Sequence, residues 1–323
     1  MRYATVGTSW ITESFIDASR MVEGFSLHSV YSRSGKKAEM FAERHQANSF
    51  YTDLGGLAKD SHVDCIYIAS PNSLHYEHAM QFLTNGKHVI CEKPIFSNTK
   101  ELEEAYKVAE GHNVYLFEAM RNIHSPNFDV LRDRLPQAGT LRNCVLHRSR
   151  YSSKYDSYLQ GDEPNVFTLA YSGGALVDMG IYPLYLAVAL FGEPESISYH
   201  PVLLESGVDG SGTLILNYDN FTCTVMCSKI TTSHIPCEIC GEMGTFTFEN
   251  AAFIDDLQFI DTETNHATSI PTNAIAEDMV YEIERFKHII LTYDNVAYQR
   301  LKALSLQVLA ITEEARHQNG IVY

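Results

Sequence analysis

The chain has 323 residues, of which 45% are hydrophobic and 20% charged, a composition typical of a folded globular protein and not of a disordered one. Its 40 Asp and Glu outnumber its 24 Lys and Arg, so the net charge is −16 at pH 7. Because such a surface repels phosphate backbones and anionic lipids, we expect neither a nucleic-acid partner nor a membrane partner.

Cysteine usage and the first residues of the chain indicate its compartment. The seven Cys are scattered and odd in number, which argues against a secreted disulfide framework. The start of the chain lacks the pattern of a signal peptide, and no apolar stretch approaches the roughly 18 residues that span a bilayer. We therefore expect a cytoplasmic protein.

Short strand patterns alternate with helical patterns over the first 120 residues. This alternation predicts an α/β fold with a doubly wound parallel sheet, in which crossover helices connect the strands. In chain order the predicted elements are a strand at 3–6, a helix at 14–22, a strand at 25–31, a helix at 36–45, a strand at 63–69, a helix at 75–85, a strand at 88–91, a helix at 100–110 and a strand at 114–117.

The pattern changes after about residue 140. Several strands separated by turn residues indicate an α+β domain with a large, mostly antiparallel sheet and helices on one face. We divide the chain into a first domain, 1–120, and a second domain, 121–323. The predicted strands lie at 141–150, 196–204, 212–218, 222–228, 236–240, 244–248 and 257–261, and the predicted helices at 174–191, 274–292 and 295–318.

The turn after the first strand is a candidate dinucleotide site. A dinucleotide fold places the pattern G-x-G-x-x-G here, so that backbone amides at the start of the next helix can hold the diphosphate. Only the first glycine, Gly7, is present, and Ser9 and Thr12 occupy the other two places. The segment Gly7, Thr8, Ser9, Trp10 and Ile11 is therefore either a phosphate-binding turn or an ordinary connection between strand and helix.

The end of the second strand bears on which cofactor would bind. NAD-binding folds place an Asp or Glu here for the ribose 2′-hydroxyl, whereas a 2′-phosphate needs a cation and no carboxylate. The chain has Ser32 and Arg33 at this point, with Lys36 and Lys37 close behind. We expect NADP in preference to NAD, and the alternative is a solvated basic turn.

Three further segments carry a resemblance to a known family. The third strand is followed by Ser70, Pro71, Asn72 and His75, the next strand by Glu92-Lys93-Pro94, and the helix predicted at 174–191 contains Asp178 and Tyr182. In this order they resemble the Gfo/Idh/MocA oxidoreductase family over nearly the whole chain. Tyr182, where most members have His, and Glu118-Ala119-Met120 are similar to the branch of dihydrodiol dehydrogenase and glucose-fructose oxidoreductase.

The resemblance implies a Rossmann domain and a substrate domain whose open sheet forms a homodimer or homotetramer. It implies an NAD(P)-dependent dehydrogenase that transfers hydride between the cofactor and a hydroxyl or carbonyl of a sugar, cyclitol or trans-diol. By position, Lys93 matches the catalytic lysine and Asp178 the acid of the family. The residues expected to contact cofactor are Gly7, Thr8, Ser9, Trp10, Ile11, Ser32, Arg33, Lys37, Ser70, Pro71, Asn72, His75, Glu92, Lys93 and Arg121.

The same residues suit the chemistry of alcohol oxidation. Hydride must leave the carbon while the hydroxyl proton passes to a base. The ordinary pKa of a tyrosine, about 10, is too high for an efficient base at neutral pH, and a nearby ammonium lowers it by favouring the phenolate. Lys93 can supply that charge or contact the substrate oxygen directly. Asp178 and Tyr182, spaced by four in a helix, share one face. We expect Lys93, Asp178 and Tyr182 to be catalytic.

Other functions compete with this prediction. The chain could be a non-catalytic cofactor-binding regulator, or an aldose-to-aldose oxidoreductase that retains its cofactor. A zinc site formed by the pairs Cys223/Cys227 and Cys237/Cys240 is not expected, because both pairs lie in strand patterns rather than in turns. The 14 His show no H-E-x-x-H pattern, so we expect no metal.

Overall fold

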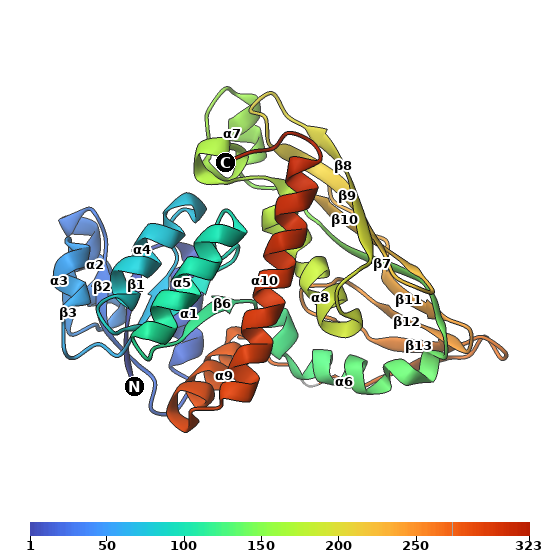
Figure 1. Cartoon of the computed structure of the whole chain (residues 1–323), viewed down its shortest axis with the longest axis horizontal. Helices are drawn as coiled ribbons and strands as arrows, with labels where there is room; N and C mark the ends of the chain where they lie inside the picture. The colour runs from blue at the N-terminus through green and yellow to red at the C-terminus, as the bar shows by residue number, and fades with distance from the viewer. Residues whose placement is uncertain (273) are drawn as a thin grey trace. The chain divides into compact units, whose positions relative to one another are not determined.

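The computed structural model describes residues 1–272 and 274–323, which form two compact units (Figure 1). Unit 1 comprises Met1–Ala119 and Ala276–Leu306, and unit 2 comprises Met120–Ile275 and Gln307–Tyr323. The division drawn from the sequence gave every residue after 120 to the second domain. The segment 276–306 instead belongs with the first, because Phe286 stacks on Phe117 with ring centroids 4.5 Å apart.

Unit 1 contains a six-stranded sheet in the order β3-β2-β1-β4-β5-β6, and all of its strand pairs are parallel. This confirms the doubly wound sheet expected from the alternating pattern. In such an order the chain reverses direction of winding beside β1, where ligands bind outside the carboxyl ends of the strands. The strands are β1 (Arg2–Val6), β2 (Ser26–Tyr31), β3 (Ser49–Tyr51), β4 (Cys65–Ile68), β5 (His88–Glu92) and β6 (Leu116–Ala119).

The helices of unit 1 bury one apolar face each. In α1 the buried residues include Phe15 and Ile16, and the ring of Phe15 stacks on Tyr67 of β4 at 3.7 Å between centroids. Helices α4 and α5 lie side by side in Figure 1, and α9 packs against α1. The helices are α1 (Trp10–Ser19), α2 (Gly35–His45), α3 (Leu54–Ala58), α4 (His75–Leu83), α5 (Thr99–Gly111), α9 (Met279–Thr292) and the first part of α10 (Asn295–His317).

Unit 2 contains an eight-stranded open sheet in the order β14-β13-β12-β11-β7-β10-β9-β8. Its strand pairs are antiparallel except for β7 with β10, so the predicted mostly antiparallel sheet is confirmed. The strands are β7 (Leu141–Ser149), β8 (Ser196–Leu203), β9 (Asp209–Asn217), β10 (Thr222–Ser228), β11 (Cys237–Gly241), β12 (Gly244–Phe248), β13 (Gln258–Asp261) and β14 (Ala267–Ser269).

The single long helix predicted at 174–191 begins differently in the structure. A π-helical turn, η6 (Leu176–Gly180), precedes α8 (Ile181–Phe191), and both pack against the central strands β7 and β10. The span Leu169–Phe191 is long and apolar enough to cross a membrane, contrary to the expectation that no such stretch exists. Because 67% of its apolar window is buried inside the fold, it has the surroundings of a core helix.

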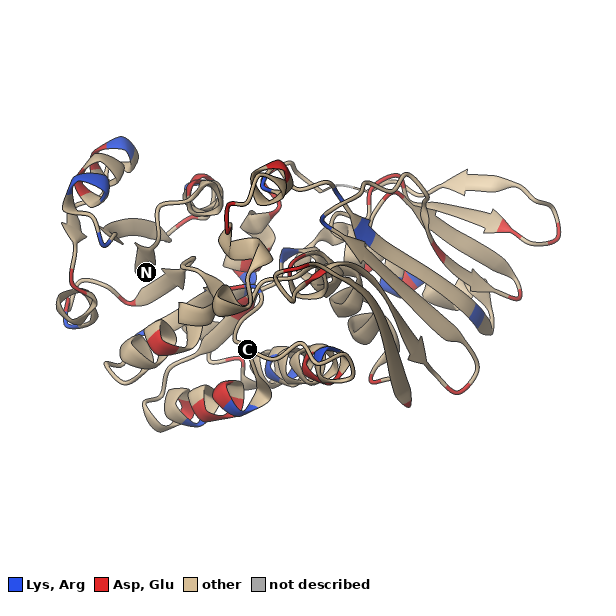
Figure 2. Ribbon diagram, turned by 90° about the horizontal axis from the view of Figure 1, so that it is seen from above, with Lys and Arg blue, Asp and Glu red and all other residues tan. Residues whose placement is uncertain are grey.

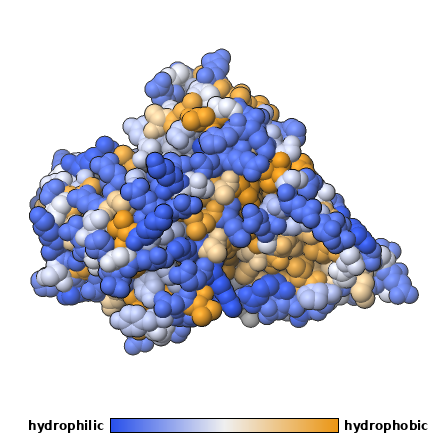
Figure 3. All heavy atoms as spheres, viewed as in Figure 1, coloured by the Kyte–Doolittle hydropathy of each residue, from blue (hydrophilic) through white to orange (hydrophobic). Residues whose placement is uncertain are grey.

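Short helices complete unit 2. They are η2 (Arg121–His124), α6 (Pro126–Arg134), η3 (Leu135–Ala138), α7 (Tyr155–Leu159), η4 (Asn165–Phe167) and η5 (Leu169–Tyr171). In Figure 2 charged residues lie mainly on helices and at turns, while the strands carry few of them. Figure 3 shows hydrophobic residues gathered around α8, between α6 and the sheet of unit 2.

All seven cysteines are free thiols, and all but the half-buried Cys240 lie in the cores of the two units. Cys223 and Cys227 lie on β10, and Cys237 and Cys240 on β11, with β7 between these two strands. Two strand spacings separate the pairs by about 10 Å, too far for four thiolates to share one zinc ion. Burial also raises the pKa of the Cys227 thiol, which disfavours the thiolate that a metal needs.

Candidate active site

The turn after β1 is built for close approach of a ligand's phosphates. Gly7 has a φ of +118°, and a Cβ at this position would stand 2.6 Å from the carbonyl oxygen of Ala69. Only glycine can occupy this position without strain. The turn leads directly into α1, whose N-cap Ser9 makes no side-chain capping bond, so the first turn of the helix is not closed by that hydroxyl. These features fit the diphosphate of a dinucleotide.

The end of β2 carries exposed positive charge. Arg33 and Lys37 are exposed, and the hydroxyl of Ser34, the N-cap of α2, accepts a hydrogen bond from the backbone N–H of Lys37 in the first turn of that helix. Asp53, at the end of the neighbouring β3, uses its carboxylate to cap α3 through the N–H of Gly56 at 2.7 Å. The end of β2 therefore has a guanidinium and no carboxylate of its own, which is the arrangement a ribose 2′-phosphate requires.

The turn after β4 is held by two histidines. The fully buried ring of His75 faces the carbonyl oxygen of Ser70 at 2.8 Å and that of Pro94 at 2.9 Å, and so joins the turns that follow β4 and β5. Burial lowers the pKa of His75 to about 4, so the ring is neutral at physiological pH. His78 faces the hydroxyl of Ser70 at 3.0 Å. The structure thus gives His75 a role in shaping both turns.

Glu92 and Lys93 follow at the carboxyl end of β5. The hydroxyl of Tyr67 donates to a carboxylate oxygen of Glu92 at 2.6 Å, and the backbone N–H of Lys93 donates to the other at 3.3 Å. The Lys93–Pro94 peptide bond is cis. Glu118, from the neighbouring β6, accepts the N–H of Ile95 at 3.1 Å and so fixes the chain beyond the proline. Lys93 is therefore presented from a backbone that is anchored on both sides.

Asp178 lies in the π-helical turn η6 of unit 2. One of its carboxylate oxygens is 2.6 Å from the ammonium of Lys229, whose side chain is only 1% exposed. Lys229 also donates to the carbonyl of Val166 at 3.0 Å and lies 4.8 Å from the ring centroid of Phe167. The Asp178 side chain is 24% exposed, so the buried Lys229 fixes the carboxylate while leaving it accessible to a ligand. π-turns of this kind are frequent at functional sites.

A second buried acid supports the start of this turn. Asp209 is fully buried and accepts hydrogen bonds from the N–H of Leu176 and the hydroxyl of Tyr199, both at 2.6 Å. Gly174, with a φ of +135°, leaves space for it, since a Cβ there would lie 2.2 Å from an Asp209 oxygen. Burial raises the pKa of Asp209 to about 6. Asp209 thus anchors the first residue of η6.

Tyr182 is the second residue of α8, and two cationic groups of unit 2 lie near it. The guanidinium of Arg121 lies 6.0 Å from the ring centroid of Tyr182 and 5.0 Å from that of Phe253. Arg148 lies 5.3 Å from the Phe253 ring, and burial lowers its pKa while the neighbouring Tyr182 raises it. The side-chain amide of Asn122 donates to the backbone carbonyl of Tyr182 at 3.0 Å. These contacts place positive charge beside the Tyr182 ring.

The structure brings the predicted residues together in two groups. In unit 1 the turns after β1, β2, β4 and β5 share one edge of the parallel sheet, and in unit 2 Asp178 and Tyr182 sit on consecutive helical turns. Arg121, expected at the cofactor, belongs to unit 2 and lies against Tyr182. Sequence reasoning missed Lys229, Arg148 and Asp209, because isolated charged residues in strand patterns carry no spacing signal.

Comparison with known proteins supports the resemblance. The model of the oxidoreductase family with NAD-binding Rossmann fold, Gfo/Idh/MocA, matches residues 1–120, and the model of the Gfo/Idh/MocA C-terminal domain matches residues 135–247. The chain is also 41% identical over 325 aligned residues, covering 100% of the chain and 98% of the relative, to the scyllo-inositol 2-dehydrogenase (NADP(+)) IolU of Bacillus subtilis. The chain belongs to the Gfo/Idh/MocA family.

Further members of the Gfo/Idh/MocA family place the chain within it. It is 27% identical to the trans-1,2-dihydrobenzene-1,2-diol dehydrogenase of Xenopus laevis, with 91% of this chain and 90% of that one covered, which confirms the predicted branch. Among solved structures, KijD10, a 3-ketoreductase from Actinomadura kijaniata in complex with NADP and TDP-benzene, matches with a TM-score of 0.85 at 20% identity over 98% of this chain and 97% of that one. At this identity the structural match establishes the fold.

Proposed function

We propose that the chain is an NADP-dependent dehydrogenase that transfers hydride between the cofactor and a CH–OH group of a cyclitol, sugar or trans-diol. The relative at 41% identity over the full chain is named as an NADP-dependent scyllo-inositol 2-dehydrogenase, and the diol dehydrogenase relatives act on vicinal hydroxyls by name. All of these substrates are small polyols or diols, so we expect a substrate with adjacent hydroxyl groups.

The turns of unit 1 fit the proposed cofactor. The close approach at Gly7 admits a diphosphate, and Arg33, with Lys37 nearby, suits the 2′-phosphate of NADP better than the ribose of NAD. NAD remains the alternative cofactor. We propose cofactor contacts for Gly7, Thr8, Ser9, Trp10, Ile11, Ser32, Arg33, Lys37, Ser70, Pro71, Asn72, Glu92 and Lys93, with His75 acting through the turns it joins, and with Arg121 at cofactor or substrate.

The catalytic roles follow from the charge that the reaction moves. Bound NADP⁺ supplies the hydride acceptor for oxidation, and NADPH supplies the donor for the reverse reaction. As hydride leaves the carbon, the hydroxyl proton passes to Tyr182, which lies beside the guanidinium groups of Arg121 and Arg148. Lys93 stabilises the negative charge that develops on the substrate oxygen. Asp178 accepts a hydrogen bond from an adjacent substrate hydroxyl and so orients the carbon.

The observation that carries the proposal is the ion pair of Asp178 with the buried Lys229, one helical turn from Tyr182. Burying an ammonium is costly unless it is paired and hydrogen-bonded. Here the pair fixes the orientation of a partly exposed carboxylate, which suits binding of a polyol hydroxyl and serves no evident purpose in a regulator without turnover. A non-catalytic sensor would not need Lys93 and Tyr182 as catalytic side chains, yet the chain has both.

A substrate-panel assay tests the proposal. Purified protein is incubated with NADP⁺ or NAD⁺ and with inositols, aldoses and trans-diols, and formation of reduced cofactor is followed by its absorbance. We expect turnover with at least one vicinal diol or cyclitol, faster with NADP⁺. Cofactor binding without turnover across the panel would support a regulatory protein instead. Nicotinamide cofactor that co-purifies and is reduced and reoxidised by a pair of aldoses would indicate an aldose-to-aldose oxidoreductase.

Compartment and assembly belong to the same proposal. The free thiols of the described cysteines suit a reducing cytoplasm. We propose a homodimer or homotetramer formed through the open sheet of unit 2, since that sheet exposes large apolar side chains such as Val202 and Leu203 of β8. Light scattering coupled to size-exclusion chromatography measures the mass directly, and a monomer at micromolar concentration would contradict the assembly.

A further inference from the structure

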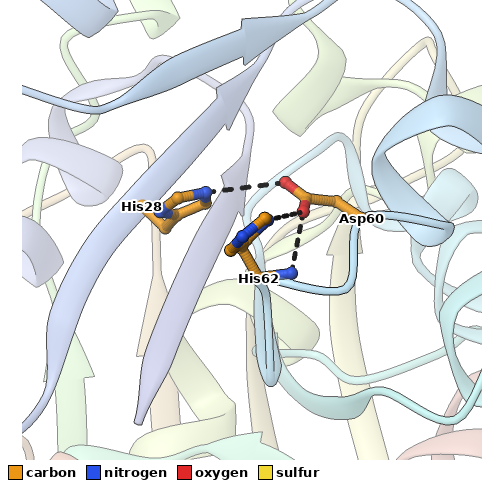
Figure 4. A group of neighbouring side chains, drawn as sticks. All are labelled: His28, Asp60 and His62. Carbon is orange, nitrogen blue, oxygen red and sulfur yellow. Dashed lines mark hydrogen bonds and ion pairs between the residues drawn. The ribbon is translucent and has the colours of Figure 1, made fainter.

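Two histidines and an aspartate of unit 1 converge away from the proposed catalytic residues (Figure 4). His28 lies on β2, and Asp60 and His62 lie in the segment that connects α3 to the start of β4. This segment leads into the amino end of β4, whereas the proposed cofactor turns follow the carboxyl ends of the strands. The cluster is therefore separate in the sheet from the dinucleotide site.

The donor atoms have the separations of metal ligands. Nε2 of His28 lies 3.7 Å from one carboxylate oxygen of Asp60, and Nδ1 of His62 lies 3.3 Å from the other. One donor atom from each residue can be chosen so that all three lie within 4.8 Å of one another. Tetrahedral zinc with bonds of about 2.0–2.1 Å needs donors about 3.4 Å apart, so small side-chain rotations would bring all three donors to one ion.

The carboxylate is held in place by hydrogen bonds. Asp60 accepts one from the backbone N–H of His62 at 2.8 Å and another from the hydroxyl of Tyr51 at 3.0 Å. The ammonium of Lys87 donates to the backbone carbonyls of Asp60 and Val63, both at 2.7 Å, and so fixes the segment. Such hydrogen bonds around a ligand orient it for metal binding.

Both imidazole rings face the same carboxylate. The rings are stacked at 5.6 Å between centroids, and one nitrogen of each is directed at Asp60. In one tautomer such a nitrogen donates its hydrogen to the carboxylate, and in the other it is an acceptor with a lone pair that a metal ion can bind. A single divalent ion satisfies both nitrogens and the carboxylate together.

We propose that His28, Asp60 and His62 form a binding site for a divalent transition-metal ion of the zinc type, completed by solvent as the fourth ligand. Imidazole and carboxylate are ligands that zinc takes in proteins. The side chain of His28 is 17% exposed and that of Asp60 7%, while that of His62 is 66% exposed, so the ion enters from the side of His62. The ion ties β2 to the segment entering β4 and stabilises that edge of the sheet, without a part in hydride transfer.

Metal titration tests the site without reference to activity. Chelator-treated full-length protein is titrated with Zn²⁺ in competition with a chromophoric chelator, and with Co²⁺ while the visible absorption of the bound ion is followed. We expect one Zn²⁺ per chain and a tetrahedral Co²⁺ spectrum. His62→Gln should weaken binding by at least about tenfold, and Tyr51→Phe, which removes a hydrogen bond to the carboxylate, by about tenfold. The exposed His266→Gln is the matched control and should leave binding unchanged.

Thermal unfolding provides a second readout. Equimolar Zn²⁺ should raise the unfolding temperature of the wild-type protein and of His266→Gln, but not that of His62→Gln. Because His62 is exposed, this variant should fold, and its NADP binding verifies that it has. The proposal is overturned if the wild-type protein binds no Zn²⁺, or if binding of equal affinity persists in both His62→Gln and His28→Gln, which would mean adventitious metal elsewhere on the surface.

Discussion

The ammonium of Lys229 lies 2.6 Å from the carboxylate of Asp178, on a side chain that is 1% exposed. Lys229 follows β10 directly, and Asp178 lies in the π-helical turn that packs on that strand. The pair therefore holds Asp178, the proposed substrate-orienting acid, against a central strand of the unit 2 sheet. A charge held in this way resists rotation, because any movement of the carboxylate leaves a buried ammonium unpaired.

Replacing this lysine should impair catalysis through Asp178. Lys229→Met keeps the length of the side chain and removes its charge, so the carboxylate loses its fixed orientation. We expect kcat to fall by about 10²-fold with NADP affinity unchanged. Lys302→Met, which removes another paired lysine, is the control. A kcat near the wild-type value would contradict the positioning role.

Lys93 should matter far more for turnover than for cofactor binding. Lys93→Met removes the charge that stabilises the developing negative charge on the substrate oxygen. We expect turnover to fall by at least about 10²-fold, while the NADP dissociation constant changes much less. Lys100→Met, an exposed lysine in the first turn of α5, should behave as wild type. Turnover near the wild-type rate in Lys93→Met would remove Lys93 from the mechanism.

Gly7 should be irreplaceable for a steric reason. In Gly7→Ala the added Cβ meets the Ala69 carbonyl at 2.6 Å and the backbone keeps an unfavourable φ of +118°. We expect a loss of about 1–3 kcal/mol in stability from the strain, and weaker NADP binding because the turn must shift. Gly86→Ala is the control, because Gly86 has a φ of +73° but an added Cβ there would meet no atom within 4 Å. This variant therefore introduces backbone strain without a steric clash. Equal loss of NADP affinity in both variants would contradict a specific role of Gly7 in binding the diphosphate.

Arg33 should set the preference for NADP. Arg33→Ala removes a charge-assisted contact with the 2′-phosphate that is worth about 1.5–3 kcal/mol. The ratio of kcat/KM for NADP⁺ to that for NAD⁺ should therefore fall by about 10- to 100-fold, with the NAD⁺ value little changed. Arg20→Ala, at a surface ion pair with Asp17, serves as the control. A ratio that does not move would mean that the phosphate binds elsewhere or that NAD is the cofactor.

Acid should destabilise the protein through His75. Its pKa is about 4 in the folded chain and 6.5 in the reference state, so below pH 6.5 the unfolded chain binds a proton that the folded chain does not. Stability is therefore lost as the pH falls from 6.5 to about 4, by about 3 kcal/mol in total. The unfolding temperature of His75→Gln should change less over this range than that of wild type, and the exposed His112→Gln should match wild type. Equal slopes for all three would contradict the assignment.

The predicted elements of the parallel sheet were recovered because alternation of short strands with helices is a strong periodic signal. β3 (Ser49–Tyr51) was missed because three residues are too few to show a period, and α3 (Leu54–Ala58) because it contains two glycines. The contact of Phe286 with Phe117 was also missed, since a sequence read in order gives no sign that a late helix returns to an early strand.

The sequence likewise predicted some residues of the candidate site and missed others. Lys93, Asp178 and Tyr182 were found through motifs that follow strands or open a helix. A spacing of four does not distinguish an α-helical turn from the π-turn that holds Asp178, because both place such residues near one face. Lys229 and Arg148 are distant in sequence from the residues they contact, so only the pairing of β7 with β10 reveals them.

The course of the chain through the two units limits how the protein can be recombined. Residues 120–275 are inserted between β6 and α9, and both of these elements belong to unit 1. A fragment that ends at residue 120 would lack the partners of Leu116 and Phe117, whose N–H and ring contact Tyr298 and Phe286. Gln307–Tyr323 also belongs to unit 2. A chimera that acquires a new polyol specificity from a relative should therefore be spliced after Ala119, before Ala276 and after Leu306, as a graft with three junctions.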